Sequence, residues 1–294
     1  MYDSVNDLEK MIDQLATQLA DGFFQTIQVL TRVTSALEKY YEGSHSRFVA
    51  EKSAMIAKEL GMNEEEVMET RIAALLHDIG KVGMPDALLF KYPTELSQQE
   101  YKQYSLHPEI GMHILKPYKA FDTVGEIIYQ SHEKLDGSGF PRHLQRDNIH
   151  PAAKIIIVVD YFHNGVYRRQ RQKPEVTGGS GQVTSTMNYL ESTRDKYNNT
   201  LNFLHKKSNI LFEKKAVQLL TEIMELERKN MGHKSVMRLP VNNLEPGMIF
   251  AEDYYTSYGM LVAAKGEVIT KESMNALARF VDAGEIPFKI LVIK

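Results

Sequence analysis

Hydrophobic positions recur at steps of three and four along the first thirty residues. This spacing places apolar side chains on one face of an α-helix. The positions are Leu8, Ile12, Leu15, Leu19, Phe23, Ile27 and Leu30. The pattern therefore predicts a long amphipathic helix. Two roles are open for its apolar face, which could pack on the helix's own domain or could join two copies of the chain and relay a signal.

Further helical patterns follow as far as Phe162, with polar caps at their starts and glycine or proline near their ends. Asn63 precedes three glutamates, and Ser97 opens a capping box, both of which are typical helix starts. The expected helices run from Arg47 to Leu60, from Asn63 to His77, from Ser97, from Pro108 to about Lys116, from Asp122 to His132 and from Ala152 to Phe162. Loops are expected at Met84–Thr94 and Asp136–His150.

The next stretch, Arg168–Gln182, is basic and then rich in glycine and serine. It predicts a solvated loop, with a lid or an anion-binding arm as the alternative. Helical periodicity returns over Ser185–Asn230, followed by a polar linker at Met231–Ser235.

The period changes again in the last sixty residues, where short β-like runs flank one helical segment. The runs are Val236–Val241, Met248–Ala251, Met260–Ala263 and Phe288–Ile293, and the helix is expected from Thr270 to Ala283. The sequence thus predicts a mainly α fold. Its expected parts are an N-terminal helical segment (1–41), a helical bundle (42–230) and a small β-rich C-terminal module (236–294).

Composition narrows the choice of function classes. The chain has 294 residues, a net charge of −3 and no cysteine. Disulfides, thiolate zinc sites and iron–sulfur clusters are therefore excluded, and no global positive field favours a nucleic-acid polymer as partner. No apolar run reaches the roughly 18 residues of a membrane span, and the polar N-terminus does not resemble a signal peptide. These features favour a cytoplasmic protein.

The pair His77–Asp78 ends the apolar run Ile72–Leu76. A buried carboxylate needs a cation or hydrogen-bond donors nearby, and imidazole and carboxylate are both good metal ligands. On its own, a single His-Asp sequence of this kind favours a paired histidine in the core over a metal ligand. Four further stretches offer a histidine or aspartate beside an apolar segment, namely those around His45, His107, His132 and Asp160.

Taken together, these stretches resemble the HD-GYP family, the branch of the HD-domain phosphohydrolases that hydrolyses cyclic di-GMP. The resemblance covers Tyr40–Tyr161, and its most specific part is Ser131-His132-Glu133-Lys134-Leu135-Asp136-Gly137-Ser138-Gly139-Phe140-Pro141. It implies an HD-domain helical bundle that acts as a metal-dependent phosphodiesterase in bacterial second-messenger signalling.

The resemblance also implies roles for individual residues. His45, His77, Asp78 and Asp160 would surround one metal ion, and Asp78 would bridge to a second ion held with His107 and His132. This set of ligands favours iron or manganese over zinc. Lys81 would bind phosphate and assist catalysis with Asp78, the alternative being an exposed lysine at a helix end. Gly137, Gly139, Phe140 and Pro141 would form the substrate-binding loop.

Four departures from the family pattern stand beside these implications. Ser131 replaces a histidine ligand, Phe140 replaces the tyrosine of the Gly-Tyr-Pro motif, and Tyr41 stands where some members have a glutamate that holds a third metal. The family's Arg-Pro-Tyr-Arg-like segment after Asp160 is not recognisable. We therefore expect two metal ions. A degenerate receptor or scaffold with little turnover is the alternative function, and homodimerisation through the N-terminal helix and contacts with signalling proteins are expected.

Overall fold

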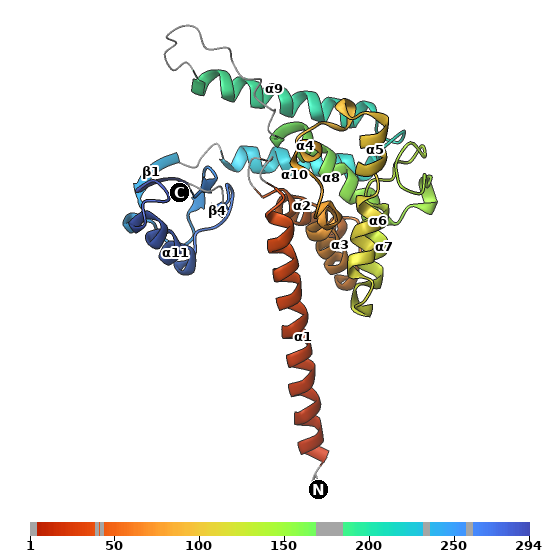
Figure 1. The fold of residues 1–294 in the computed structure, drawn as a ribbon, viewed down its shortest axis with the longest axis horizontal. Coiled ribbons are helices and arrows are strands. Elements are labelled where there is room, and N and C mark those ends of the chain that lie inside the picture. Colours follow the sequence, from red (N-terminus) through yellow and green to blue (C-terminus); the bar gives the residue numbers. More distant parts are fainter. Residues whose placement is uncertain (1–4, 39–40, 42–43, 169–184, 232–235, 257–260) are drawn as a thin grey trace.

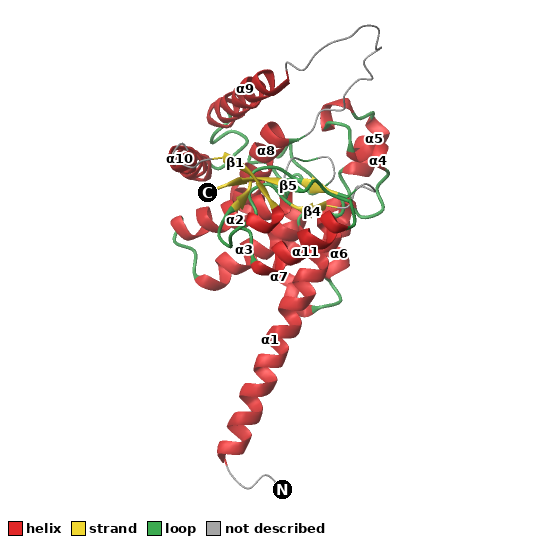
Figure 2. Ribbon diagram, turned by 90° about the vertical axis from the view of Figure 1, so that its left-hand side faces the viewer, coloured by secondary structure: helices red, strands yellow, loops and turns green. Residues whose placement is uncertain are grey.

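The computed structural model describes residues 5–38, 41, 44–168, 185–231, 236–256 and 261–294. One long helix, α1 (Val5–Ser35), extends away from a body of packed helices, and a small mixed module follows at the C-terminal end (Figure 1). Figure 2 shows the same arrangement from the side, and within the described residues all strands lie between residues 236 and 293. The expected mainly α fold with a C-terminal β-rich part is confirmed.

The helical body is built from nine further helices within the described residues. They are α2 (His45–Glu59), α3 (Glu64–Leu76), α4 (Asp86–Leu89), α5 (Gln98–Tyr104), α6 (His107–Leu115), α7 (Asp122–Gln130), α8 (Pro151–Tyr167), α9 (Ser185–Lys206) and α10 (Lys214–Met231). Short 3-10 turns join several of them: η1 (Ile79–Lys81), η2 (Pro93–Glu95), η3 (Lys119–Phe121) and η4 (Arg146–Asn148).

Local sequence explains where the helices that carry the site begin. A complete capping box starts α3, in which the Asn63 side chain accepts from Glu66 N and the Glu66 side chain accepts from Asn63 N. Pro151 opens α8, and the His150 ring accepts from Ala152 N at 3.2 Å. The middle of α8 is apolar on nearly every side and lies in the main core with the inner faces of α2, α3, α7 and α10.

The structure corrects the expectations for two loops and refines the expectation for one helical stretch. The predicted loop Met84–Thr94 contains α4 and the start of η2, and the helical stretch after Ser185 is divided into α9 and α10. Arg168 is not solvated, because it is 5% exposed and donates hydrogen bonds to the carbonyls of Leu89 and Lys91. The rest of the predicted solvated loop, 169–184, lies outside the described residues, as do residues 232–235 of the predicted linker.

The C-terminal module has its own hydrophobic cluster, with Phe250, Ile290 and Val292 completely buried. Its five short strands are β1 (Val236–Pro240), β2 (Ile249–Phe250), β3 (Tyr254–Tyr255), β4 (Leu261–Ala263) and β5 (Lys289–Ile293). One antiparallel sheet has the order β1-β5-β2, and β3 pairs with β4 across a register shift. The sequence missed β3, since two residues at an irregularity give no alternating pattern. Helix α11 (Lys271–Asp282) covers the module's core, and η5 (Val241–Asn243) precedes β2.

Only the C-terminal part of α1 packs on the body. Ile27 is buried, and Phe23 and Leu30 pack against the main core. Leu15 and Leu19, earlier on the helix, are 50% and 68% exposed. The C-terminal half of the helix therefore packs on its own domain, as in the first predicted role, and the other half is exposed. Within the described part of the chain, no helix combines the length and apolar character that crossing a membrane requires.

Candidate metal centre

Each predicted metal ligand lies at or near a helix end or on the central helix. His77 is the C-cap of α3 and Asp78 follows it, while η1 turns the chain immediately afterwards. His107 is the first residue of α6, and Asp160 lies on α8. His132 follows the end of α7. All of these side chains are buried, so the bundle gathers them inside the helical body.

The closeness of η1 and α6 depends on a glycine. A Cβ added to Gly80 would collide with the carbonyl oxygen of His107, and it would lie 2.6 Å from Gly111 N. The backbone that carries Asp78 can therefore approach the start of α6 only without a side chain at this position.

Three ligand atoms form the first of two groups. His45 Nε2 lies 3.2 Å from His77 Nε2 and 3.2 Å from Asp160 Oδ1, while His77 Nε2 lies 3.6 Å from the same oxygen. Helix α2 supplies His45 as its first residue. The start of α2 is held by Glu38, whose carboxylate accepts from Ser46 N at 2.7 Å and from the Ser46 hydroxyl.

The second group consists of Asp78, His107 and His132. His107 Nε2 lies 2.9 Å from His132 Nε2 and 3.6 Å from Asp78 Oδ1. Asp78 also faces the first group, because its Oδ2 is 3.7 Å from His45 Nε2 and its Oδ1 is 3.4 Å from His77 Nε2. Asp78 is thus the carboxylate that lies between the two groups.

Hydrogen bonds outside the groups orient two of the rings. The Nδ1 atoms of His77 and His107 donate to the carbonyls of Ala74 and Tyr104, each at 2.7 Å. A carbonyl can only accept, so the neutral imidazole carries its proton on Nδ1 and offers a lone pair at Nε2. In both residues the Nε2 atom is the one that faces a ligand group.

These residues fit a bound metal. Asp78 Oδ1 is buried and has no hydrogen-bond partner among the described residues. A buried oxygen left in this state costs free energy unless a cation satisfies it. Pairs of imidazole Nε2 atoms at 2.9 Å and 3.2 Å, each beside a carboxylate, form the set of donors that binds divalent transition metals.

The protonation of the two groups differs. Burial lowers the pKa of His77, but the carboxylates of Asp78 and Asp160 outweigh it and raise the pKa to about 9. Burial lowers the pKa of His132 to about 4, and burial together with His132 and Lys81 lowers the pKa of His107 well below its usual value. Burial opposes ionisation of Asp78, yet the surrounding His77 and Lys81 hold the pKa of its carboxyl well below the ordinary range. A metal ion must therefore displace a proton from His77, whereas His107 and His132 are neutral before it binds.

Lys81 is not the exposed helix-end lysine of the alternative interpretation. It is 3% exposed, its Nζ lies 2.7 Å from Asp78 Oδ2, and it lies 5.3 Å from the centre of the Tyr104 ring. The η1 turn folds the lysine back toward the carboxylate. Lys81 thus places a positive charge beside the ligand groups.

The glycine-containing loop reaches the site through Phe140. The Phe140 ring stacks on His132, with centroids 5.0 Å apart and planes 8° apart. Gly139 has no room for a side chain, because a Cβ would lie 2.5 Å from Glu133 Cα and 2.5 Å from His132 O. Glu133 accepts hydrogen bonds from Arg142 N and Leu144 N, which shapes the loop after Pro141. The peptide bond between Phe140 and Pro141 is cis.

Gly137 contributes to the loop's shape. It has φ +81° and lies against Gln145, two features that a side chain would disturb. Ser131 is completely buried, and its hydroxyl donates to the Ile128 carbonyl at 2.8 Å. The hydroxyl is therefore engaged by the last turn of α7.

Three residues near the site were not predicted to have a role. The Tyr41 ring stacks on His45 at 4.0 Å, and its hydroxyl donates to Asn164 Oδ1. Asn164 in turn donates to Asp160 Oδ1 at 2.7 Å, and His163 Nδ1 lies 3.0 Å from His45 Nδ1. Spacings of three and four residues from Asp160 along one helix could have identified His163 and Asn164. In the sequence, these residues stand out only as departures from the family pattern.

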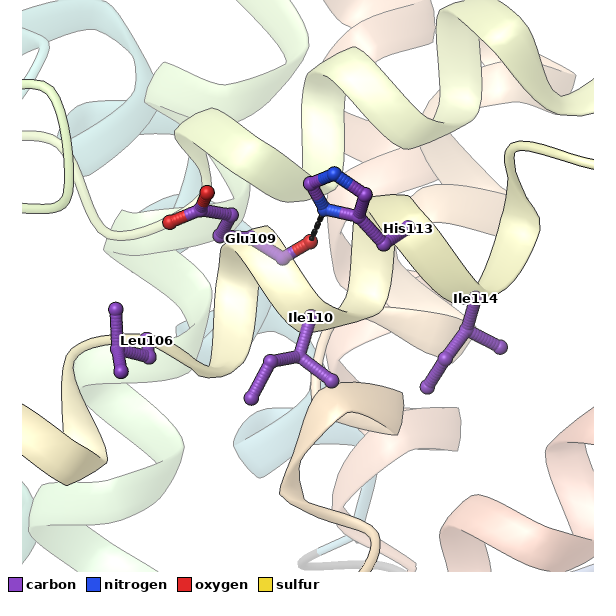
Figure 3. Close-up of a pocket in the computed structure, with 5 residues that line it drawn as sticks. All are labelled: Leu106, Glu109, Ile110, His113 and Ile114. Atoms are coloured by element: carbon purple, nitrogen blue, oxygen red, sulfur yellow. Dashed lines mark hydrogen bonds between the residues drawn. The ribbon is translucent and has the colours of Figure 1, made fainter.

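A surface hollow on α6 is distinct from this centre. Leu106, Glu109, Ile110, His113 and Ile114 line it, and His113 Nδ1 donates to the Glu109 carbonyl at 2.8 Å (Figure 3). None of these five residues belongs to either ligand group. The hollow lies on the exposed side of the helix whose first residue, His107, points inward.

Comparison with known proteins agrees with the geometry. Residues 27–201 match the family model of the HD domain, and this protein belongs to that family. A cyclic di-GMP phosphodiesterase of Thermotoga maritima is 35% identical over 57% of this chain and 46% of its own length. The cyclic di-GMP phosphodiesterase response regulator RpfG of Xanthomonas campestris is 38% identical over 46% of this chain and 36% of its own.

A third relative is named for a different cyclic dinucleotide. The 3'3'-cGAMP-specific phosphodiesterase 3 of Vibrio cholerae is 37% identical over 49% of this chain and 31% of its own length. The expected kinship with the HD-GYP branch is confirmed by relatives of this kind. The chain spans less than half the length of each of these three proteins.

Proposed function

We propose that this protein hydrolyses the phosphodiester bonds of cyclic di-GMP at a binuclear metal centre. The observation that carries the proposal is the pair of buried ligand groups that share the space around Asp78. His45, His77 and Asp160 would hold one ion, His107 and His132 would hold the other, and Asp78 would serve both. Iron or manganese suits these nitrogen and oxygen donors.

The metal ions would supply Lewis acidity and an activated water to a phosphodiester. Lys81 neutralises developing negative charge on the phosphate from its position beside Asp78. Phe140, stacked on His132, presents an aromatic ring to a base, and Gly139 keeps the loop backbone close to the site. Cyclic di-GMP is an intracellular messenger, so the proposed place of action is the cytoplasm.

A receptor or scaffold with little turnover is the second candidate, and Ser131 is the observation that favours it. Its hydroxyl is committed to the Ile128 carbonyl, so the second group has three ligand residues rather than four. Weak occupancy of the second ion would leave nucleotide binding without hydrolysis. Under this candidate, Ser131→His raises turnover, whereas Ser131→Ala does not.

A turnover assay on metal-replete protein tests the proposal. Cyclic di-GMP and 3'3'-cGAMP are supplied separately, and the linear products are separated by chromatography. Hydrolysis is supported if the wild type consumes cyclic di-GMP and Asp78→Asn does not. Asp147→Asn, at an exposed position in η4, is the control and should consume it like the wild type. Nucleotide binding without product supports the receptor. Preference for cGAMP would correct the substrate while leaving the chemistry intact.

We also propose that the chain forms a homodimer through α1. The exposed half of the helix presents Ile12, Leu15 and Leu19 to solvent, which a second copy of the same helix would cover. Signalling proteins that act on the far end of α1 are the proposed further partners.

A further inference from the structure

The Nδ1 atoms of the histidines in the two ligand groups have two kinds of partner. Those of His77 and His107 face backbone carbonyls, which accept and never donate. His45 Nδ1 instead lies 3.0 Å from Nδ1 of another histidine, His163. The tautomer of His45 is thus not fixed by the backbone but depends on a side chain.

A hydrogen bond between two imidazole nitrogens needs one donor and one acceptor. His45 Nε2 faces the first ligand group, at 3.2 Å from both His77 Nε2 and Asp160 Oδ1. To offer a lone pair there, neutral His45 must carry its proton on Nδ1. His163 must then accept at Nδ1 and carry its own proton on Nε2.

The His163 ring is held firmly enough for this task. It is 2% exposed. Its ring centroid lies 4.8 Å from that of Phe48, 4.9 Å from that of Tyr167 and 5.4 Å from that of Tyr41. It also lies three residues after Asp160 on α8. One rigid helix therefore carries both a ligand of the first group and the partner of another ligand.

We propose that His163 is a positioning residue that fixes the orientation and tautomer of His45, so that the His45 Nε2 lone pair points at the first ligand group. The inference rests on the metal centre of the proposed function. It does not require that the centre turns over any substrate.

The first test follows the His45 Nδ1–H proton in protein loaded with zinc, a diamagnetic ion. In metal-free protein Asp160 Oδ1, which can only accept and lies 3.2 Å from His45 Nε2, competes for a proton on that nitrogen. Long-range proton–nitrogen NMR of nitrogen-15 histidine identifies the Nδ1–H proton, and its exchange with solvent reports its hydrogen bond. In the wild type this proton should exchange slowly. In His163→Phe, which keeps a ring but removes the acceptor, it should exchange markedly faster. His163→Asn keeps an acceptor near the Nδ1 position and should restore slow exchange. The exposed His113→Asn on α6 is the matched control.

The second test titrates each protein with manganese. His163→Phe should weaken manganese binding at the first group by about 10–100-fold, as loss of an outer-shell partner typically does. Binding of the second manganese ion, at the other group, should not change. His163→Asn should recover most of this loss, and His113→Asn should match the wild type.

The outcomes separate the inference from the proposed function. Unchanged proton exchange and unchanged metal affinity in a folded His163→Phe protein overturn the inference. Complete loss of one bound ion in both His163 variants also overturns it, because His163 would then be a ligand. Wild-type protein that binds metal and shows slow exchange of the His45 proton, but does not hydrolyse cyclic di-GMP, defeats the proposed function and supports the role of His163.

Discussion

At the scale of single residues, Asp78 is the ligand whose substitution should affect both metal ions. Its two oxygens face His77 and His107 on one side and His45 and Lys81 on the other. Asp78→Asn keeps the size of the side chain and removes its charge. We expect affinity for both metal ions to fall by at least about 10–100-fold, more than is lost with an outer-shell partner.

Elemental analysis after purification without chelator measures this effect. Asp147→Asn, at an exposed position, serves as the control. If Asp78→Asn retains two ions per chain, the bridging role is wrong, even if the other ligands are correct.

His77 makes metal binding depend on pH. Its pKa of about 9 lies above the usual value of 6.5, so His77 holds a proton at neutral pH in metal-free protein. Metal binding should release about one proton per chain at about pH 7.5 and almost none above about pH 10, so that apparent affinity rises with pH between these values. Calorimetry in two buffers of different ionisation enthalpy counts the proton. Release of no proton at about pH 7.5 would contradict the raised pKa of His77.

The sequence predicted which residues would meet, but it did not show what orients them. His45, His77, Asp78, His107, His132 and Asp160 all lie in the two groups. The carbonyls of Ala74 and Tyr104 have no side-chain signature, so the tautomers of His77 and His107 could not be inferred. Lys81 lies beside Asp78, in agreement with the site position that the resemblance implied and not with the exposed alternative, although the 3-10 turn that places it there was not predicted.

At the scale of elements, the contact between η1 and α6 fixes how closely Asp78 and His107 approach. Gly80→Ala forces a Cβ against the His107 carbonyl, and overpacking of this kind costs about 1–3 kcal/mol of unfolding free energy. Gly22→Ala, on α1 with no atom near its added Cβ, should instead stabilise by about 0.5–1 kcal/mol through helix propensity. Urea unfolding of metal-free protein measures both. Equal effects of the two substitutions would contradict the assigned contact.

Helix starts were predictable because capping residues act locally. Asn63 and Ser97 are both the N-caps that the sequence indicated; the capping box was predicted at Ser97, and the structure has one at Asn63 as well. The short helix α4 and the break between α9 and α10 were missed, since four residues show no full period and helical patterns continue on both sides of residues 207–213. Tertiary packing decides such boundaries.

At the scale of the whole molecule, the open half of α1 should determine the oligomeric state. We expect the wild-type chain to be a dimer in light scattering after size exclusion. Leu15→Glu combined with Leu19→Glu should yield monomers, because like charges would replace the apolar contact. Gln18→Glu adds charge between these positions on the same exposed stretch and serves as the control. A dimer that survives the double substitution would place the interface elsewhere.

The attachment of α1 has a mechanical consequence. Its 31 residues span about 46 Å, and only the last part rests on the helical body (Figure 1). Just beyond its end, Glu38 holds the backbone of Ser46, the neighbour of His45. Most of α1 is therefore unsupported by the body, and the chain just after its packed end contacts the neighbour of one ligand residue. Torque applied near Met11 would reach His45 through Glu38 and Ser46, and it would reach α3 and η1 as well, because the packed end of α1 also contacts them.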